Sequence, residues 1–214
     1  GILYDAQGPN NSVTMGDASS LLAFSEAIGC IQRGMADVML TGGTGTRLSL
    51  VSLMMYGEQQ LSQRKDDPAH ASRPFDADRS GSGDGYRRAI TKALQVADLA
   101  PDAIGHVNAH GESTTRGDAC EAQALRDTLG DVPVTALKSY FGNLGAGSGA
   151  VELLGSLQAF ESGEIPITLN YETADADCPV NVVHKQPAKS DKPVALAVNQ
   201  SRSGQTAAMI IAAP

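Results

Sequence analysis

The sequence predicts an α/β fold in which helices and strands alternate along the chain. Three observations indicate it: helix-length stretches with apolar residues at three- and four-residue steps, short apolar runs between them, and 23 glycines among 214 residues. Such alternation is typical of a parallel or mixed sheet covered by helices. Abundant glycine favours tight turns and close packing of helices on that sheet.

Helical periodicity is clearest near the start of the chain. Residues 18–33 place their apolar side chains on one helical face. Gly34 follows, where a glycine commonly ends a helix. The same periodicity predicts three later helices, over residues 87–98, 117–129 and 150–162.

Short apolar runs predict the strands. The first, residues 36–40, is expected to be a buried strand that ends in a turn at Gly42 and Gly43. The runs 194–198 and 207–212, near the C-terminus, are expected to be neighbours in the sheet. The polar stretch 62–85, rich in Gly, Pro, Asp and Arg, predicts a loop. The remaining predicted strands cover residues 104–109, 132–137, 194–198 and 207–212.

Composition excludes several classes of function. A net charge of −8 argues against nucleic acid as a partner; the basic residues between 64 and 88 form either a local patch or a solvated loop. The three cysteines have no paired spacing, so neither a disulfide framework nor a metal site is expected, and a reducing, cytoplasmic compartment is favoured. The longest apolar run, residues 207–214, is too short to cross a membrane.

Candidate functional residues follow the predicted strands. His110 ends the run 104–109, at the strand end where α/β proteins commonly bind ligands, although a structural role in the turn is equally open. Lys138 leaves the next strand, and a lysine there must be paired or catalytic. Asp118 and Glu121 begin the third helix, where acidic side chains also favour the helix dipole.

A glycine-rich stretch, residues 142–149, precedes the fourth helix. Its spacing differs from the dinucleotide-binding fingerprint, so nucleotide binding is not expected. The stretch predicts a tight turn that lets the start of a helix approach a ligand or another backbone.

Taken in order, these pieces resemble one family, the β-ketoacyl-acyl-carrier-protein synthases, which are the elongating condensing enzymes of the thiolase fold. The resemblance covers nearly the whole chain. It rests on Gly8-Pro9-Asn10, Ala36 through Gly43, Ser72 through Asp76, Val107 through Gly111, Gly117-Asp118 with Glu121, Lys138-Ser139, and Gly145 through Glu152.

The resemblance implies a thiolase-like layered α/β/α architecture, incomplete in this chain. Residues 1–85 would end the N-terminal half and carry the nucleophile-position helix, and residues 86–214 would form the C-terminal half with the His110 and Lys138 site. The part before Gly1 is expected to be absent. A segment with two core strands is also expected to be missing between Gly85 and Tyr86, either lost or omitted where separate pieces are joined.

The resemblance also assigns roles. In the family, a cysteine at a helix N-terminus attacks an acyl thioester, and two histidines bind the oxygen where enolate charge develops. The first histidine corresponds to His110 and the lysine to Lys138. The family's glutamate and aspartate correspond to Glu121 and Asp118.

Three positions depart from the family pattern. Asp17 stands where the cysteine belongs, and as an N-cap it would suit the helix start. Asn143 stands in the place of the second histidine; it can donate a hydrogen bond but cannot shuttle a proton. Glu112 replaces a threonine expected to line the pantetheine tunnel, near Thr114. The loop 199–206 lacks both family phenylalanines, and its Ser203 and Gly204 are further candidates for substrate contact.

Together the departures favour a ketosynthase-like partner subunit without condensing activity, similar to the chain-length factors of polyketide systems. One partner would be acyl carrier protein, which brings its own phosphopantetheine, so no cofactor of the protein itself is expected. The other would be a second subunit, in a homodimer or in a heterodimer with an active ketosynthase. Two alternatives stay open. One is an active acyltransferase of the 3-oxoacyl-acyl-carrier-protein synthase type with an atypical site, or a malonyl-thioester decarboxylase. The other is a non-enzymatic scaffold.

Overall fold

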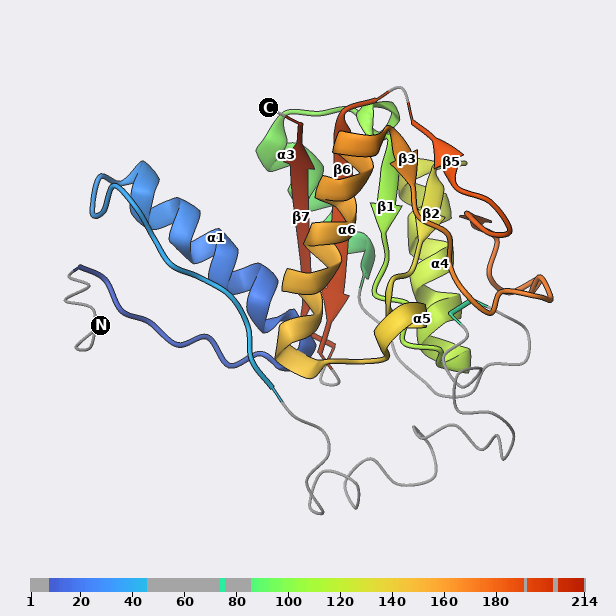
Figure 1. Ribbon diagram of the computed structural model, residues 1–214, viewed down its shortest axis with the longest axis horizontal. Helices are drawn as coiled ribbons and strands as arrows, with labels where there is room; N and C mark the ends of the chain where they lie inside the picture. The colour runs from blue at the N-terminus through green and yellow to red at the C-terminus, as the bar shows by residue number, and fades with distance from the viewer. Residues whose placement is uncertain (1–7, 46–73, 76–85, 191, 202–203, 214) are drawn as a thin grey trace, which may run out of the picture.

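A mixed five-stranded sheet forms the centre of the computed structural model, which describes residues 8–45, 74–75, 86–190, 192–201 and 204–213 (Figure 1). Its strand order is β4-β2-β1-β6-β7. All neighbours pair in parallel except β6 and β7, which are antiparallel as the adjacent apolar runs predicted. The strands are β4 (Asn181–Val182), β2 (Pro133–Thr135), β1 (His106–Asn108), β6 (Val194–Gln200) and β7 (Thr206–Ala212).

Helices cover both faces of this sheet. The pair α1 (Ser19–Gln32) and α6 (Ser148–Ser162) lies on one face, and the pair α3 (Tyr86–Ala97) and α4 (Thr115–Leu129) lies on the other (Figure 1). The layered α/β/α architecture is thereby confirmed. Shorter elements complete the described chain: η2 (Gly16–Ala18), η4 (Pro101–Ala103), α5 (Lys138–Phe141), η5 (Gly145–Gly147), and the antiparallel pair β3 (Glu164–Ile165) and β5 (Ala188–Lys189).

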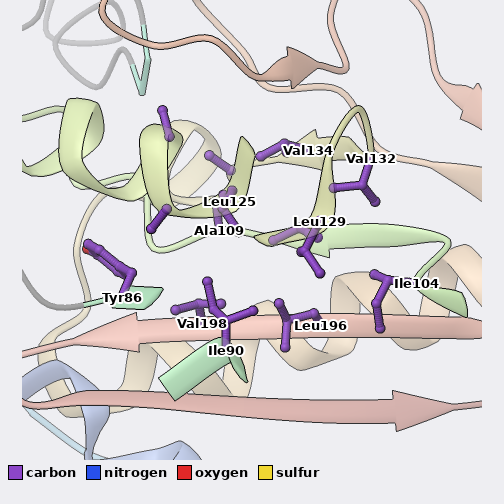
Figure 2. Packing of buried hydrophobic residues seen from close by; sticks show 14 of the residues in the cluster. Tyr86, Ile90, Ile104, Ala109, Leu125, Leu129, Val132, Val134, Leu196 and Val198 are labelled. Atoms are coloured by element: carbon purple, nitrogen blue, oxygen red, sulfur yellow. The ribbon is translucent and has the colours of Figure 1, made fainter. Parts of the chain in front are cut away.

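The alternation of side chains along the strands divides the core. On β6, Leu196 and Val198 face α3 and α4, whereas Ala197 lies in a smaller cluster with α1 and α6. Figure 2 shows the larger cluster, in which Ile90 and Leu125 are fully buried. Burial of each such side chain contributes about 1.5–3 kcal/mol.

The end of α1 confirms the role predicted for Gly34. This residue has a φ of 67°, and its N–H donates to the Ile31 carbonyl at 2.9 Å. The N–H of Met35 donates to the Cys30 carbonyl at 3.0 Å. These two bonds define a Schellman motif, which favours glycine because the left-handed conformation costs it nothing.

The prediction of a strand over residues 36–40 is wrong. This segment follows α1 without regular structure, and Val38 and Leu40 are 78% and 90% exposed. A strand needs a hydrogen-bonded neighbour, and within the described ranges no strand lies beside this segment. The apolar run was therefore a poor guide, because pairing is decided by chain segments distant in sequence.

The starts of α1 and α6 approach each other closely. A Cβ added at Gly149 would lie 2.9 Å from both the Leu21 Cγ and the Ser20 Oγ. The Ser20 hydroxyl accepts a hydrogen bond from the Ala150 N–H at 3.2 Å. The glycine-rich stretch therefore serves close backbone packing, one of the two uses predicted for it. The close approach brings Asp17 and Asn143 together.

Two further observations concern the described part of the chain. None of its helices combines the length and the apolar character needed to cross a membrane. All three cysteines are free thiols.

Candidate active site

His110 lies just beyond β1, and its backbone is held by α4. The Glu121 carboxylate accepts the N–H of His110 at 2.7 Å and that of Gly111 at 2.9 Å. Burial raises the pKa of Glu121 to about 7, against the opposing effects of His110 and of the Gly111 N–H. Glu121 therefore positions the turn that carries the histidine and does not itself reach the ring.

Asp118 performs a similar structural task one turn earlier. Its carboxylate accepts the Phe75 N–H at 2.8 Å and the Thr114 N–H at 3.2 Å. Phe75 is fully buried and has a φ of 63°, so this bond holds an unfavourable backbone conformation in place. Thr114, predicted to contact substrate, is the N-cap residue of α4.

A buried network surrounds the other side of the His110 ring. The Lys138 ammonium donates to Glu152 Oε1 at 2.5 Å and to the His110 carbonyl at 2.7 Å, and lies 3.1 Å from His110 Nδ1. Asn199 Nδ2 donates to Glu152 Oε2 at 2.5 Å, and its Oδ1 lies 3.4 Å from the same Nδ1. The expectation that Lys138 is paired or catalytic is met by Glu152, which neutralises it.

Glu152 and Asn199 are site residues that the sequence did not single out. Glu152 is the only charged residue between Lys138 and Glu161. An isolated charge in the apolar first part of α6, 14 residues after a lysine expected to be paired, was the available signal. Asn199 comes from β6, and nothing in its local sequence indicated its place.

The three positions expected to depart from the family pattern meet in one cluster. Asn143 Nδ2 donates to Asp17 Oδ2 and to Glu112 Oε1, both at 2.8 Å. The Gly145 N–H donates to Asn143 Oδ1 at 2.7 Å, which fixes the orientation of the amide. Across the cluster, Glu112 Oε2 lies 3.7 Å from His110 Nε2.

The role of Asp17 differs from the predicted one. Asp17 lies within η2, and Ala18 is the N-cap residue of α1, with no hydrogen bond from a capping side chain. Ser19 instead binds the start of the helix, accepting the Met15 N–H at 2.8 Å. The N-cap prediction is wrong because the Asp17 carboxylate turns to Asn143, whose position depends on a distant part of the chain.

The hairpin between β6 and β7 lies close to this cluster. A Cβ added at Gly16 would lie 3.2 Å from the Ser201 Cβ, so the hairpin turn packs beside Asp17. Gly204 lies in this turn with a φ of 83° and is exposed, and Ser203 lies outside the described residues. A role for either residue in substrate contact stays a prediction.

Tyr86 closes the site from α3. Its ring centroid lies 6.5 Å from that of His110, and burial raises its pKa well above the ordinary value, with Glu121 and Asp118 adding to the effect. The phenol therefore stays neutral. The site as a whole combines two hydrogen-bond donors, His110 and Asn143, with two carboxylates that face them.

Comparison with known families identifies the family and the fold. Residues 1–94 match the N-terminal domain of β-ketoacyl synthases, and residues 62–172 match the C-terminal domain. The chain belongs to the β-ketoacyl synthase family and has its thiolase-like fold.

Relatives come from both fatty-acid and polyketide synthesis. The chain is 30% identical to 3-oxoacyl-[acyl-carrier-protein] synthase 2 of Synechocystis, over 85% of this chain and 56% of the relative. It is 29% identical to the ketoacyl synthase alpha subunit of the tetracenomycin polyketide synthase of Streptomyces glaucescens, over 98% of this chain and 61% of the relative. That second match spans 260 residues although this chain has 214, which supports the expectation of a missing stretch. Its place between Gly85 and Tyr86 stays a prediction.

Solved structures show the same fold. A type II polyketide ketosynthase bound to its acyl-carrier protein, AntDE:AntF, has a TM-score of 0.93 at 24% identity, over all of this chain and 65% of that chain. The ishigamide ketosynthase/chain length factor has a TM-score of 0.82 at 22% identity, over 95% of this chain and 60% of that chain. This chain thus spans about three fifths of the length of its relatives and is ketosynthase-like.

Proposed function

We propose that this protein is a non-condensing, ketosynthase-like partner subunit that handles acyl thioesters carried by acyl carrier protein. One observation carries the proposal: the carboxylate of Asp17 is hydrogen-bonded at 2.8 Å to the amide of Asn143. These are the two residues expected at the positions of the nucleophile and of the second histidine. A carboxylate accepts an acyl group only as a mixed anhydride, which water hydrolyses readily. The residue in the cysteine's place therefore does not support a stable acyl-enzyme.

The electrostatics of the cluster support the same conclusion. Condensation develops negative charge on a thioester oxygen, which the family binds with two hydrogen-bond donors. Here Asp17, Glu112 and His110 each place one polar atom within 4.8 Å of the other two. A negative oxygen at that distance from one carboxylate is disfavoured by about 3–4 kcal/mol at an effective dielectric of 20. This corresponds to a rate lower by about 10²–10³-fold.

The partners of the proposed subunit follow from its relatives. One solved relative is a ketosynthase in complex with its acyl-carrier protein, and another is a ketosynthase with a chain length factor. By analogy, this protein would receive acyl groups on the carrier's phosphopantetheine, without a cofactor of its own. It would shape the acyl tunnel of an active ketosynthase in a heterodimer, and a homodimer is the alternative assembly.

Decarboxylation of malonyl thioesters is a second candidate. It is favoured by the retained His110 and by the Lys138–Glu152 pair behind it, at 2.5 Å. This reaction needs donors at the thioester oxygen but no acyl-accepting nucleophile. The carboxylates of Asp17 and Glu112 oppose it for the electrostatic reason given above, so decarboxylation ranks second.

A direct experiment separates these functions. The protein is incubated with reactive acyl thioesters and with malonyl thioesters, and intact mass and released CO₂ are measured with and without an active ketosynthase. We expect no acyl adduct and no CO₂ from the protein alone. A covalent adduct on the unaltered protein would refute the partner role. Release of CO₂ without an adduct would favour the decarboxylase. If the protein changes neither the acylation nor the CO₂ release of an active ketosynthase, the scaffold is favoured.

Replacement of the nucleophile-position residue sharpens this test. Asp17→Cys is expected to gain one acyl group from a reactive acyl thioester, because the start of α1 is retained and favours a thiolate. Asp17→Ala is the matched control and is expected to gain none. A folded Asp17→Cys variant that stays unmodified would show that the acyl tunnel has also been lost.

A further inference from the structure

Asp17 and Glu112, two of the three positions expected to depart from the family pattern, lie beside His110 and form with it a set of metal-binding groups. We propose that His110, Asp17 and Glu112 bind one divalent cation of the zinc or manganese type. Nothing in the sequence spacing indicated such a site, since Asp17 is 93 residues from His110. The proposal does not depend on whether the protein condenses, decarboxylates or only binds acyl groups.

The geometry of the three groups suits a small cation. One nitrogen of His110 and one oxygen from each carboxylate lie within 4.8 Å of one another. Tetrahedral metal–ligand bonds of about 2.0–2.2 Å place the ligand atoms about 3.3–3.6 Å apart. The three groups would therefore have to close by up to about 1.5 Å, which side-chain rotation of the two carboxylates can supply. Asp17 and His110 are buried and Glu112 is half-buried, so the cluster is sheltered but can be reached.

The second observation concerns His110 itself, which is 3% exposed. Within the described part of the chain, its Nε2 makes no hydrogen bond, and the nearest charged group is Glu112 Oε2 at 3.7 Å. Its Nδ1 has two possible partners, Lys138 Nζ as a donor at 3.1 Å and Asn199 Oδ1 as an acceptor at 3.4 Å. The ring can therefore carry its proton on either nitrogen.

Asn199 makes the metal-binding tautomer available. Its amide is oriented because Nδ2 donates to Glu152, which leaves Oδ1 to accept from the Nδ1–H of His110. A metal-binding histidine commonly donates its other N–H to such an oxygen. Lys138 retains Glu152 and the His110 carbonyl as acceptors in that state.

Asn143 holds the two carboxylates in place. It donates one amide hydrogen to Asp17 and one to Glu112, and its own oxygen is held by the Gly145 N–H. One nitrogen and two carboxylate oxygens form a donor set that suits Zn²⁺, Mn²⁺ or Fe²⁺. Mg²⁺ and Ca²⁺ prefer oxygen alone. The site is thus expected to discriminate against the latter two cations.

The test uses untagged, metal-free protein titrated with Mn²⁺ and with Zn²⁺, followed by electron paramagnetic resonance and calorimetry. We expect one equivalent of Mn²⁺ to bind, Zn²⁺ to displace it, and Mg²⁺ to compete poorly. Asp17→Asn and Glu112→Gln should each weaken binding by more than about 100-fold, and Asn199→Leu by about 10–100-fold. Glu26→Gln, which alters an exposed carboxylate on α1, should bind the metal unchanged.

Circular dichroism checks that each variant is folded. Absence of saturable binding to the unaltered protein would overturn the proposal, as would binding that survives both Asp17→Asn and Glu112→Gln. Either result would leave the acylation assay above unaffected, because that assay reads mass and CO₂ rather than metal.

Discussion

The buried pair of Lys138 and Glu152 offers the sharpest test of the site's construction. The two side chains are 1% and 0% exposed, and Lys138 Nζ lies 2.5 Å from Glu152 Oε1. Lys138→Met would remove the ammonium while keeping a similar apolar stem. The Glu152 carboxylate would then retain Asn199 as its side-chain partner among the described residues. A buried carboxylate that loses its counter-charge is not solvated by water, so its negative charge is left uncompensated.

The expected cost follows from that isolation. Removing one partner of a buried pair destabilises a protein by about 3–5 kcal/mol, out of a total of about 5–15 kcal/mol for a domain. At about 2–4 °C per kcal/mol for a chain of this size, the melting temperature should fall by about 6–20 °C. The double variant Lys138→Met with Glu152→Gln removes both charges and keeps an acceptor for Asn199. It should be more stable than Lys138→Met by at least about 2 kcal/mol.

The assay is urea unfolding followed by circular dichroism, with Lys92→Met as the control. Lys92 lies exposed on α3, so its replacement should change the free energy of unfolding by less than about 0.5 kcal/mol. The reasoning is refuted if Lys138→Met is as mild as this control. It is also refuted if the double variant is no more stable than the single one.

Two further predictions concern stability. Burial lowers the pKa of His106 to about 4 from 6.5, so the unfolded chain binds a proton before the folded one does. His106 should therefore contribute a loss of about 3 kcal/mol of stability as the pH drops from about 6.5 to 4. Glu121, whose pKa is raised to about 7, acts in the opposite direction over this range, so the His106 effect is the difference between the parent and a His106→Asn variant. A variant with the same pH dependence as the parent in urea titrations would contradict the assignment. Gly155→Ala would place a Cβ against the buried Leu137, and overpacking should cost about 1–3 kcal/mol. An unchanged unfolding midpoint would show that Leu137 can move aside.

Much of the fold could be predicted because its signals are local. The helical periodicity of residues 18–33 and the glycine after them predict α1 and its end, since a helix makes its hydrogen bonds within itself. The short apolar runs around β1, β2, β6 and β7 were recognisable because an apolar run is visible in the sequence itself. The run 36–40 failed as a strand, because a strand depends on a neighbour that its own residues do not specify.

The candidate site shows the same difference between local signals and contacts with distant segments. Sequence reasoning placed His110 at a strand end and required a partner for Lys138. It could not name Glu152, because that pairing depends on how α6 packs over β1. It expected Asp17 to cap its own helix, whereas the carboxylate binds Asn143, 126 residues away.

The sequence by itself therefore indicated the family and the helices, and it predicted that Asp17 and Asn143 stand in the places of the cysteine and the second histidine. These conclusions depend on residue identity and on interactions within a few positions. Only the tertiary structure decided that Asp17, Glu112 and Asn143 form one hydrogen-bonded cluster around His110. The physical reason is that the cluster forms where the starts of α1 and α6 meet the end of β1. Glycine at position 149 permits that close approach, and no local pattern encodes it.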